Sequence, residues 1–253
     1  YASSANRTTG RVQDVQMMAS GDIDMNRNMF APGYPSYYPL FYSLTIKTGV
    51  TATVLTDLCV NSFYIDYGAT VNMTTDLFIG NRISNYGTFN TNNHDLRCGQ
   101  YGLQMLSNSG QNSQTNLGTS LIRIDYGIAG DPIWAGTNSI VNAGAATFNI
   151  VAQDTVFSAP ASLRLGGKTY GTINILSTAQ NRLTIKDSST ITNLNVQAGV
   201  ELKFQQGTTQ TVYNFNPAGT SGSRVKLRST TLGSKWYMNK PSGTFSGNYL
   251  DIQ

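Results

Sequence analysis

The stretch LTIKDSSTITNLNVQAGVELKFQQ, residues 183–206, contains three short runs in which apolar and polar side chains alternate. An alternation of period two over a few residues indicates a strand with one buried face. Turn formers separate the runs, at residues 187–189 and 198–199. Short strands at close spacing, with no helical pattern between them, predict a β-solenoid in which each coil covers the apolar face of the next. The alternating apolar positions are Leu183, Ile185, Leu194, Val196, Leu202 and Phe204.

The same spacing recurs upstream, around a second glycine. Two apolar residues precede Gly68 and two follow it, at the distances found around Gly199. A corner between strands needs a residue that reaches positive φ at low cost, which predicts that both glycines lie at corners. A looser third copy spans residues 139–150, around Gly144, with its second strand shifted by one residue. We therefore predict that Leu194, Val196, Leu202 and Phe204 point into one core, with Asn195 and Lys203 facing outward.

The composition narrows the class of protein. Charged residues make up only 12% of the 253-residue chain, apolar residues 40%, and the net charge is +4. This balance argues against intrinsic disorder, and the many Asn, Ser, Thr and Gly residues disfavour helices. The 17 Lys and Arg residues are spread along the chain without forming a nucleic-acid patch. No apolar run approaches membrane-spanning length. We therefore expect neither a nucleic-acid partner nor a membrane span.

Two regions are expected: an extended N-terminal assembly arm over residues 1–43 and a β-solenoid over residues 44–253. Prolines within residues 25–44 forbid a regular central strand, and aromatic side chains there offer a large area for burial. The arm is expected to pack either along its own chain or against a neighbouring chain. Residues 11–18, RVQDVQMM, fit either a strand or two helical turns. The aromatic residues assigned to the arm are Phe30, Tyr34, Tyr37, Tyr38, Phe41 and Tyr42.

Irregular pieces are expected inside the solenoid and at its end. The polar residues 92–118 and the Pro- and Trp-containing residues 126–138 predict excursions from the coil. A strand pattern at residues 249–252 lacks a polar cap, which indicates either a piece of a longer protein or an end that docks on a partner. Cys59 and Cys98 fit no metal-binding pattern, and buried thiols are favoured over a disulfide.

Part of the chain carries a repeat with a recognisable pattern. AGVELKFQQGTTQTVYNFNPAGTSGSRVKLRST, residues 198–230, is followed by a strand at Trp236 and by SGNYLDI, residues 246–252. This region resembles parallel β-helix segments of large bacteriophage and bacterial proteins. Residues 65–90 add a weaker match to coils of bacterial surface solenoids. The resemblance implies a right-handed parallel β-helix in a phage tail or virion appendage, or in a secreted or surface-attached bacterial protein. Its motifs carry no catalytic residues, and the N-terminal arm has no counterpart in them.

Acid–base chemistry on such a fold would use two carboxylates that face each other. The candidate pairs are Asp22 with Asp24 and Asp125 with Asp131. Asp22 and Asp24 would share one face of a strand. Both pairs fit turn formers or solvated strand ends better than a catalytic pair. Glu201 is the only glutamate, and the alternation predicts that it points outward.

Other catalytic and metal motifs are incomplete. His94 is the only histidine, and it lies in a polar turn without an accompanying G-x-S-x-G motif. One histidine and two separated cysteines do not supply the ligands of a zinc site. Residues 166–169, GGKT, lack the upstream glycine of a phosphate loop and are expected to form a coil corner. We expect no catalytic residue, no metal and no cofactor.

These observations favour an all-β protein, a right-handed parallel β-helix with an irregular N-terminal arm. The expected function is that of a non-enzymatic structural protein of a phage virion or tail, a fibre- or spike-like appendage. The 14 tyrosines and two tryptophans on a scaffold rich in Asn and Thr also suit contact with host-surface glycan.

The expected partners are other virion proteins and copies of the same chain, with a trimer as one form of the homo-oligomer. The expected location is the virion, outside the cell. The first alternative is a polysaccharide-degrading tailspike enzyme, which would carry a clustered carboxylate pair in a groove. The second is a bacterial adhesin, located at the cell surface.

Overall fold

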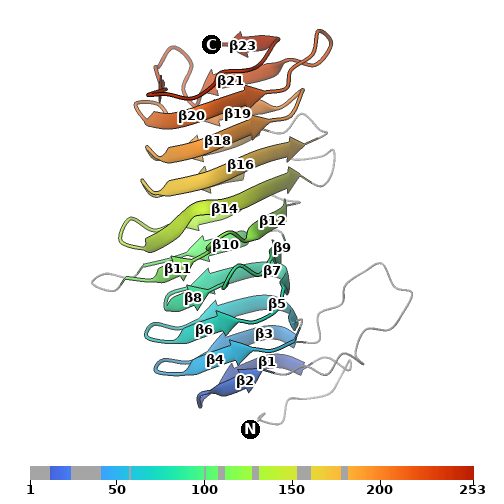
Figure 1. Cartoon of the computed structure of the whole chain (residues 1–253), viewed down its shortest axis with the longest axis vertical. Coiled ribbons are helices and arrows are strands. Elements are labelled where there is room, and N and C mark those ends of the chain that lie inside the picture. Colours follow the sequence, from blue (N-terminus) through green and yellow to red (C-terminus); the bar gives the residue numbers. More distant parts are fainter. Residues whose placement is uncertain are drawn as a thin grey trace.

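The computed structural model describes residues 12–23, 41–56, 58–99, 101–107, 112–126, 131–152, 161–177 and 182–253. In these residues the regular structure consists of β-strands, which stack in parallel pairs into one elongated column (Figure 1). The predicted all-β parallel β-helix is thereby confirmed. This part of the chain contains no helix long and apolar enough to cross a membrane.

The strands are short and follow each other closely along the chain. In the first half they are β1 (Val12–Met17), β2 (Gly21–Ile23), β3 (Phe41–Ile46), β4 (Thr51–Val54), β5 (Leu58–Ile65), β6 (Thr70–Met73), β7 (Leu77–Asn85), β8 (Thr88–Asn90), β9 (Leu96–Cys98), β10 (Gly102–Met105), β11 (Gln114–Asn116) and β12 (Leu121–Tyr126). In the second half they are β13 (Ile133–Ala135), β14 (Ile140–Ala152), β15 (Ala161–Arg164), β16 (Thr169–Ser177), β17 (Arg182–Lys186), β18 (Thr190–Val196), β19 (Glu201–Phe204), β20 (Thr209–Pro217), β21 (Val225–Ser229), β22 (Tyr237–Asn239) and β23 (Leu250–Ile252).

The pairing registers divide the column into three faces. Strand β5 pairs with β7 through residues 58–60 and again through residues 62–65, with a register shift between the two segments. The first segment belongs to the first face and the second segment to the second face. The third face begins with β2 and β4 and continues through β6, β8 and β11. Further along the chain, β13, β15, β17 and β19 follow one another on the second face.

The core lies inside the coils, where the sequence alternation placed it. Leu194, Val196, Leu202 and Phe204 are at most 1% exposed. Asn195, Lys203 and Glu201 alternate with them and are partly exposed. The predicted register is therefore confirmed. A one-residue slip would have exchanged the two sets of side chains.

Glycine has its expected role at two of the three predicted corners. Gly68 and Gly199 have φ angles of 70° and 82°, which side chains rarely adopt. Gly144 has no positive φ and lies inside β14, next to a register shift between Ala143 and Thr147. Strand β14 pairs with β11 of the third face through residues 140–142 and with β12 of the first face through residues 147–152, so Gly144 lies at a corner within the strand. This corner does not use the positive φ that was expected of its glycine.

The coil begins earlier than the expected boundary at residue 44. Strands β1 and β2 pair in parallel with β3 and β4, so residues 12–23 already belong to the solenoid. Their apolar side chains Val15, Met17 and Ile23 pack against the core. Among the arm residues, Phe30, Tyr34, Tyr37 and Tyr38 lie outside the described residues. Phe41 begins β3, and Tyr42 follows it with 61% of its surface exposed.

The coil also continues through the two expected excursions. Strands β9, β10 and β11 lie within residues 92–118, and β13 lies within residues 126–138. The first stretch has a polar sequence partly because Ser113 and Thr115 occupy buried positions that are apolar in other coils. Thr115 accepts a hydrogen bond from the buried amide of Asn85 at 2.8 Å, which satisfies both groups inside the column.

Asparagine side chains form ladders on the outside of the column. On the third face, Asn90, Asn116 and Asn142 each donate to the asparagine of the preceding coil, starting from Asn72, at 2.6–2.8 Å. A second ladder of asparagines runs along the first face. Stacked amides of this kind satisfy each other between adjacent parallel strands. The high asparagine content therefore has a structural cause.

Candidate ligand groove

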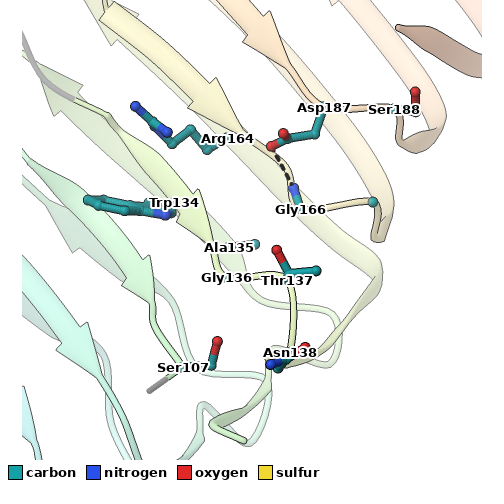
Figure 2. Close-up of a pocket in the computed structure, with 11 residues that line it drawn as sticks. Ser107, Trp134, Ala135, Gly136, Thr137, Asn138, Arg164, Gly166, Asp187 and Ser188 are labelled. Carbon is teal, nitrogen blue, oxygen red and sulfur yellow. Dashed lines mark hydrogen bonds between the residues drawn. The ribbon is translucent and has the colours of Figure 1, made fainter. Parts of the chain in front are cut away.

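A surface groove of about 590 Å³ lies where the second face turns into the third (Figure 2). Its volume falls within the range of about 300–1,000 Å³ that is typical of small-ligand sites. The lining comes from the ends of β10, β13, β15 and β17, which are successive neighbours on the second face, and from the turns after them. The lining residues are Ser107, Trp134, Ala135, Gly136, Thr137, Asn138, Arg164, Gly166, Gly167, Asp187 and Ser188.

Two glycines allow the turns of the groove to lie close against the preceding coil. A Cβ on Gly136 would lie 2.7 Å from Ser107 Oγ, and one on Gly166 would lie 2.5 Å from the carbonyl oxygen of Ala135. Gly166 also has a φ of +61°. Any larger residue at these positions would push the turns apart, so glycine determines the shape of the groove floor.

Trp134 and Arg164 form one wall of the groove. They are register partners on β13 and β15, and the guanidinium carbon of Arg164 lies 5.1 Å from the centroid of the indole ring. Arg164 Nε also donates to Asp131 Oδ2 at 2.8 Å. The stacking and the ion pair hold the arginine in place and compensate its charge. The indole keeps 38% of its surface exposed.

Asp187 stands at the opposite side of the groove, in the turn after β17. Its φ of 67° lies in the left-handed region, which Asp tolerates better than most residues. The carboxylate oxygen Oδ2 accepts a hydrogen bond from the backbone N–H of Gly166 at 3.2 Å, drawn dashed in Figure 2. Burial, with the negative charge of Asp187 as a second cause, raises the pKa of the Tyr170 phenol. The left-handed turn at Asp187 and its hydrogen bond with Gly166 thus place the Asp187 carboxylate at the groove.

The remaining polar groups are hydroxyls and amides of the turns. Ser188 Oγ accepts from the backbone N–H of Thr209 at 3.0 Å, so its own proton can be donated elsewhere. Lys168 Nζ donates to the carbonyl oxygen of Thr137 at 2.8 Å and ties two successive turns together. The groove therefore combines one carboxylate, several hydroxyls and an indole edge.

The carboxylates considered as catalytic pairs have other partners. Asp125 is buried and accepts from Arg97 Nε at 2.6 Å and from Arg123 Nε at 2.9 Å. Asp131 binds Arg164 instead, so the two aspartates belong to separate ion-pair clusters. Each carboxylate is therefore engaged by arginine side chains and does not form a pair with the other.

The other predicted residues are scattered. Asp22 is exposed on β2, whereas Asp24 lies outside the described residues. Glu201 Oε1 lies 3.7 Å from Lys203 Nζ on the same strand. His94 is part of a turn in which its backbone N–H donates to Thr91, and its Nδ1 lies 3.9 Å from Asp76.

Only one of the two cysteine side chains lies in the described part of the chain. Cys98 is a free, buried cysteine, and burial raises the pKa of its thiol. The side chain of Cys59 lies outside the described part. Within that part, no group of three or more His, Cys, Asp or Glu side chains is arranged to hold a metal ion.

No family model matches the chain, and no match was found among curated proteins or solved structures.

Proposed function

We propose that this protein is a non-enzymatic structural component of a phage virion or tail, a fibre- or spike-like appendage that contacts host-surface glycan. The observation that carries the proposal is a long parallel β-helix with a polar, hydroxyl-rich groove open on its side. The fold provides an extended scaffold, and the groove provides a place for a polar ligand.

The structural role is supported by the way neighbouring coils are joined. Parallel backbone pairing runs from β1 to β23, and side-chain amide ladders reinforce it on two faces. In a solenoid each coil is stabilised mainly by the coils before and after it. Repeating the same contacts from coil to coil therefore produces an elongated body. This construction suits a load-carrying appendage.

The non-enzymatic role is supported by the charges at the groove. Glycoside hydrolysis generally uses two carboxyl groups about 5–9.5 Å apart, one of which donates a proton. The lining contains a single carboxylate, Asp187, and nearby Asp131 is bound to Arg164. A groove of this composition can bind a sugar chain but has no second acid in its lining to cleave it.

Assembly involves the N-terminal arm in this proposal. Its partners are other virion proteins and copies of the same chain, and the assembled particle acts outside the cell. The support is the cluster of aromatic and proline residues at 25–44, together with the exposed ring of Tyr42. Aromatic side chains at this density in a sequence offer a large area for burial against a partner.

Labelling of particles tests the proposed location. Antibodies against the purified chain should label one end or the appendages of phage particles in electron micrographs. Labelling of bacterial surfaces in cultures that contain no particles would support the surface-adhesin alternative instead.

A further inference from the structure

Charge is distributed unevenly along the column. Residues 161–253 contain ten Lys and Arg residues and three Asp and Glu residues, whereas residues 1–160 contain seven and ten. The chain from β15 onward therefore carries a net charge of +7, although the whole chain carries only +4. An excess of one sign raises the local concentration of ligands of the opposite sign, so this part of the column should attract anions.

Four of these basic side chains form a row on the second face. Strands β15, β17, β19 and β21 are successive neighbours there, and each contributes one member of the row. All four side chains are partly exposed. Because neighbouring strands are about 4.8 Å apart, the row spans about 14 Å along the column. We call it the basic row, and its members are Arg164, Lys186, Lys203 and Arg228.

Like charges lie opposite each other at two places in the basic row. Arg164 is the register partner of Lys186, and Lys203 is the register partner of Arg228. Lys186 lies two residues beyond Thr184, the register partner of Lys203, and therefore on the same side of the sheet. Directly opposed like charges destabilise a sheet. An anion bound beside such a pair would remove the repulsion, so the arrangement favours an anionic ligand.

The acids near the basic row do not neutralise it. Lys186 takes part in no ion pair within the described residues. The other three members have one acidic neighbour each, and Glu201 is the most distant of these, at 3.7 Å from Lys203. Together with the adjoining groove and turns, the region has eight basic and four acidic residues. They are Arg164, Lys168, Lys186, Lys203, Arg224, Lys226, Arg228 and Lys235 against Asp131, Asp187, Glu201 and Asp251.

The side chains of these strands favour a polysaccharide over a single-stranded nucleic acid. Proteins that bind single-stranded nucleic acid place aromatic rings between their cations, so that bases stack on them. The only aromatic residue in β15, β17, β19 and β21 is Phe204, which is buried. Sugar carboxylates need no such rings, because they bind Lys and Arg through charge-assisted hydrogen bonds. Arg164 also lines the groove, so a chain bound along the row would reach the hydroxyls there.

We infer that the basic row binds an acidic polysaccharide, with the carboxylates of its uronic or sialic acid residues beside Lys186 and Lys203. The inference rests on the proposed glycan contact and adds the chemical class of the glycan. Lys186 is the central contact, because its charge is not compensated by an acid. Arg164 and Arg228, at the two ends, are held in place by their acids and extend the row of cations.

Calorimetric titration of the full chain tests this inference. The ligands are oligogalacturonides, oligomannuronides and oligosialic acids, each compared with neutral galacto- and manno-oligosaccharides of the same length. At least one acidic series should bind at least about tenfold more tightly than the neutral sugars. Its affinity should fall when NaCl is raised from about 0.05 M to about 0.5 M, because salt screens exposed charges.

Removing two charges from the row should weaken binding. In the double variant Lys186→Gln, Lys203→Gln, the affinity for the acidic series should fall by about tenfold, since two charge contacts are lost. The matched control, Lys47→Gln with Lys240→Gln, removes the same charge outside the row and should bind like the unaltered chain. The variant of the row should unfold at the same temperature as the unaltered chain or higher, because opposed like charges are removed.

Equal binding of acidic and neutral sugars would overturn the inference and leave the proposed glycan contact standing. An equal loss of affinity in both double variants would also overturn it, because net charge alone would then explain the binding. Tighter binding of oligothymidylate with the same number of charges would assign the row to nucleic acid. Binding of no sugar would overturn the inference together with the glycan contact, whereas particle labelling decides the virion location separately.

Discussion

The side-chain amide of Asn195 donates to the side-chain oxygen of Asn174 in the preceding coil at 2.6 Å. Asn174 donates in the same way to Asn149 at 2.7 Å, and Asn216 donates to Asn195 at 2.8 Å. The four residues therefore form one ladder along the first face of the column. An interior member both donates and accepts, so its removal breaks two hydrogen bonds and leaves two neighbours with unpaired groups.

Replacing an interior ladder residue should destabilise the fold. We expect Asn195→Ala to lower the free energy of unfolding by about 1–3 kcal/mol, because its two half-buried partners lose their bonds. Asn239→Ala, at an exposed position of β22, is the matched control and should change it by less than about 0.5 kcal/mol. Urea unfolding measures both. Equal values for the two variants would show that the ladder contributes nothing to stability.

Three glycines should respond to alanine in a fixed order. Gly144→Ala should be neutral, because its φ is not positive and no atom lies within 4 Å of the added Cβ. Gly68→Ala should cost about 1 kcal/mol, since its φ of +70° strains any side chain. Gly87→Ala should cost most, because its Cβ would lie 2.4 Å from the carbonyl oxygen of Ala69. Thermal unfolding ranks the variants, and any other order contradicts the corner geometry.

Acid should loosen the last strand of the column. A hydrogen bond from Arg228 lowers the pKa of Asp251, and the Nη2–Oδ2 distance is 2.7 Å. A carboxyl group with a lower pKa in the folded state stabilises that state above its unfolded pKa, and the contribution disappears as the pH falls through the folded pKa.

Amide exchange of residues 250–252, expressed as protection factors, should therefore show weaker protection at about pH 2 than at about pH 6. Asp251→Asn should show low protection at both values, because it lacks the titrating group. An unchanged pH dependence in this variant would assign the effect to another residue.

The aromatic arm should affect assembly more than stability. Replacing Tyr34, Tyr37 and Tyr38 together by serine should reduce the oligomer mass measured by light scattering, because the arm loses its buriable area. The unfolding midpoint should stay within the error of the unaltered chain. Tyr67→Ser is the control, since Tyr67 is 44% exposed outside the arm. An unchanged mass would assign the arm to its own chain instead of a neighbour.

A chain shortened to begin at Leu44 is unsuitable for this test. It would remove β1 and β2, and with them the coil that covers β3 and β4. Its loss of stability would therefore say nothing about the arm. Substitutions within the arm leave these strands in place.

The fold could be predicted from local patterns wherever inward positions are apolar. The alternation of Leu194 with Asn195 determines the register, and Gly199 marks the corner between two strands. These signals are local because successive side chains of a strand point to opposite faces. The pattern fails at Thr91 and Ser120, where buried hydroxyls bind each other at 2.8 Å and read as a loop in the sequence.

The groove could not be predicted in the same way. Trp134 and Asp187 are far apart in the sequence. They line the same groove because β13, β15 and β17 are successive neighbours on the second face. The only local signal was the double glycine at residues 166–167, which indicated a corner but no ligand site. The ion pair of Asp125 with Arg97 likewise depends on coil register, because Arg97 lies on the neighbouring strand β9. The ion pair with Arg123 is local, since that residue lies two positions earlier on β12.

The chain length of a glycan after contact with the protein tests the central claim of a non-enzymatic glycan-contacting appendage most directly. Purified host-surface polysaccharide is incubated with the full chain, recovered, and analysed by size-exclusion chromatography together with a reducing-end assay. We expect polysaccharide to be retained by the protein with its length unchanged. Shortening that disappears in Asp125→Asn or Asp22→Asn would contradict the account and establish a polysaccharide-degrading enzyme.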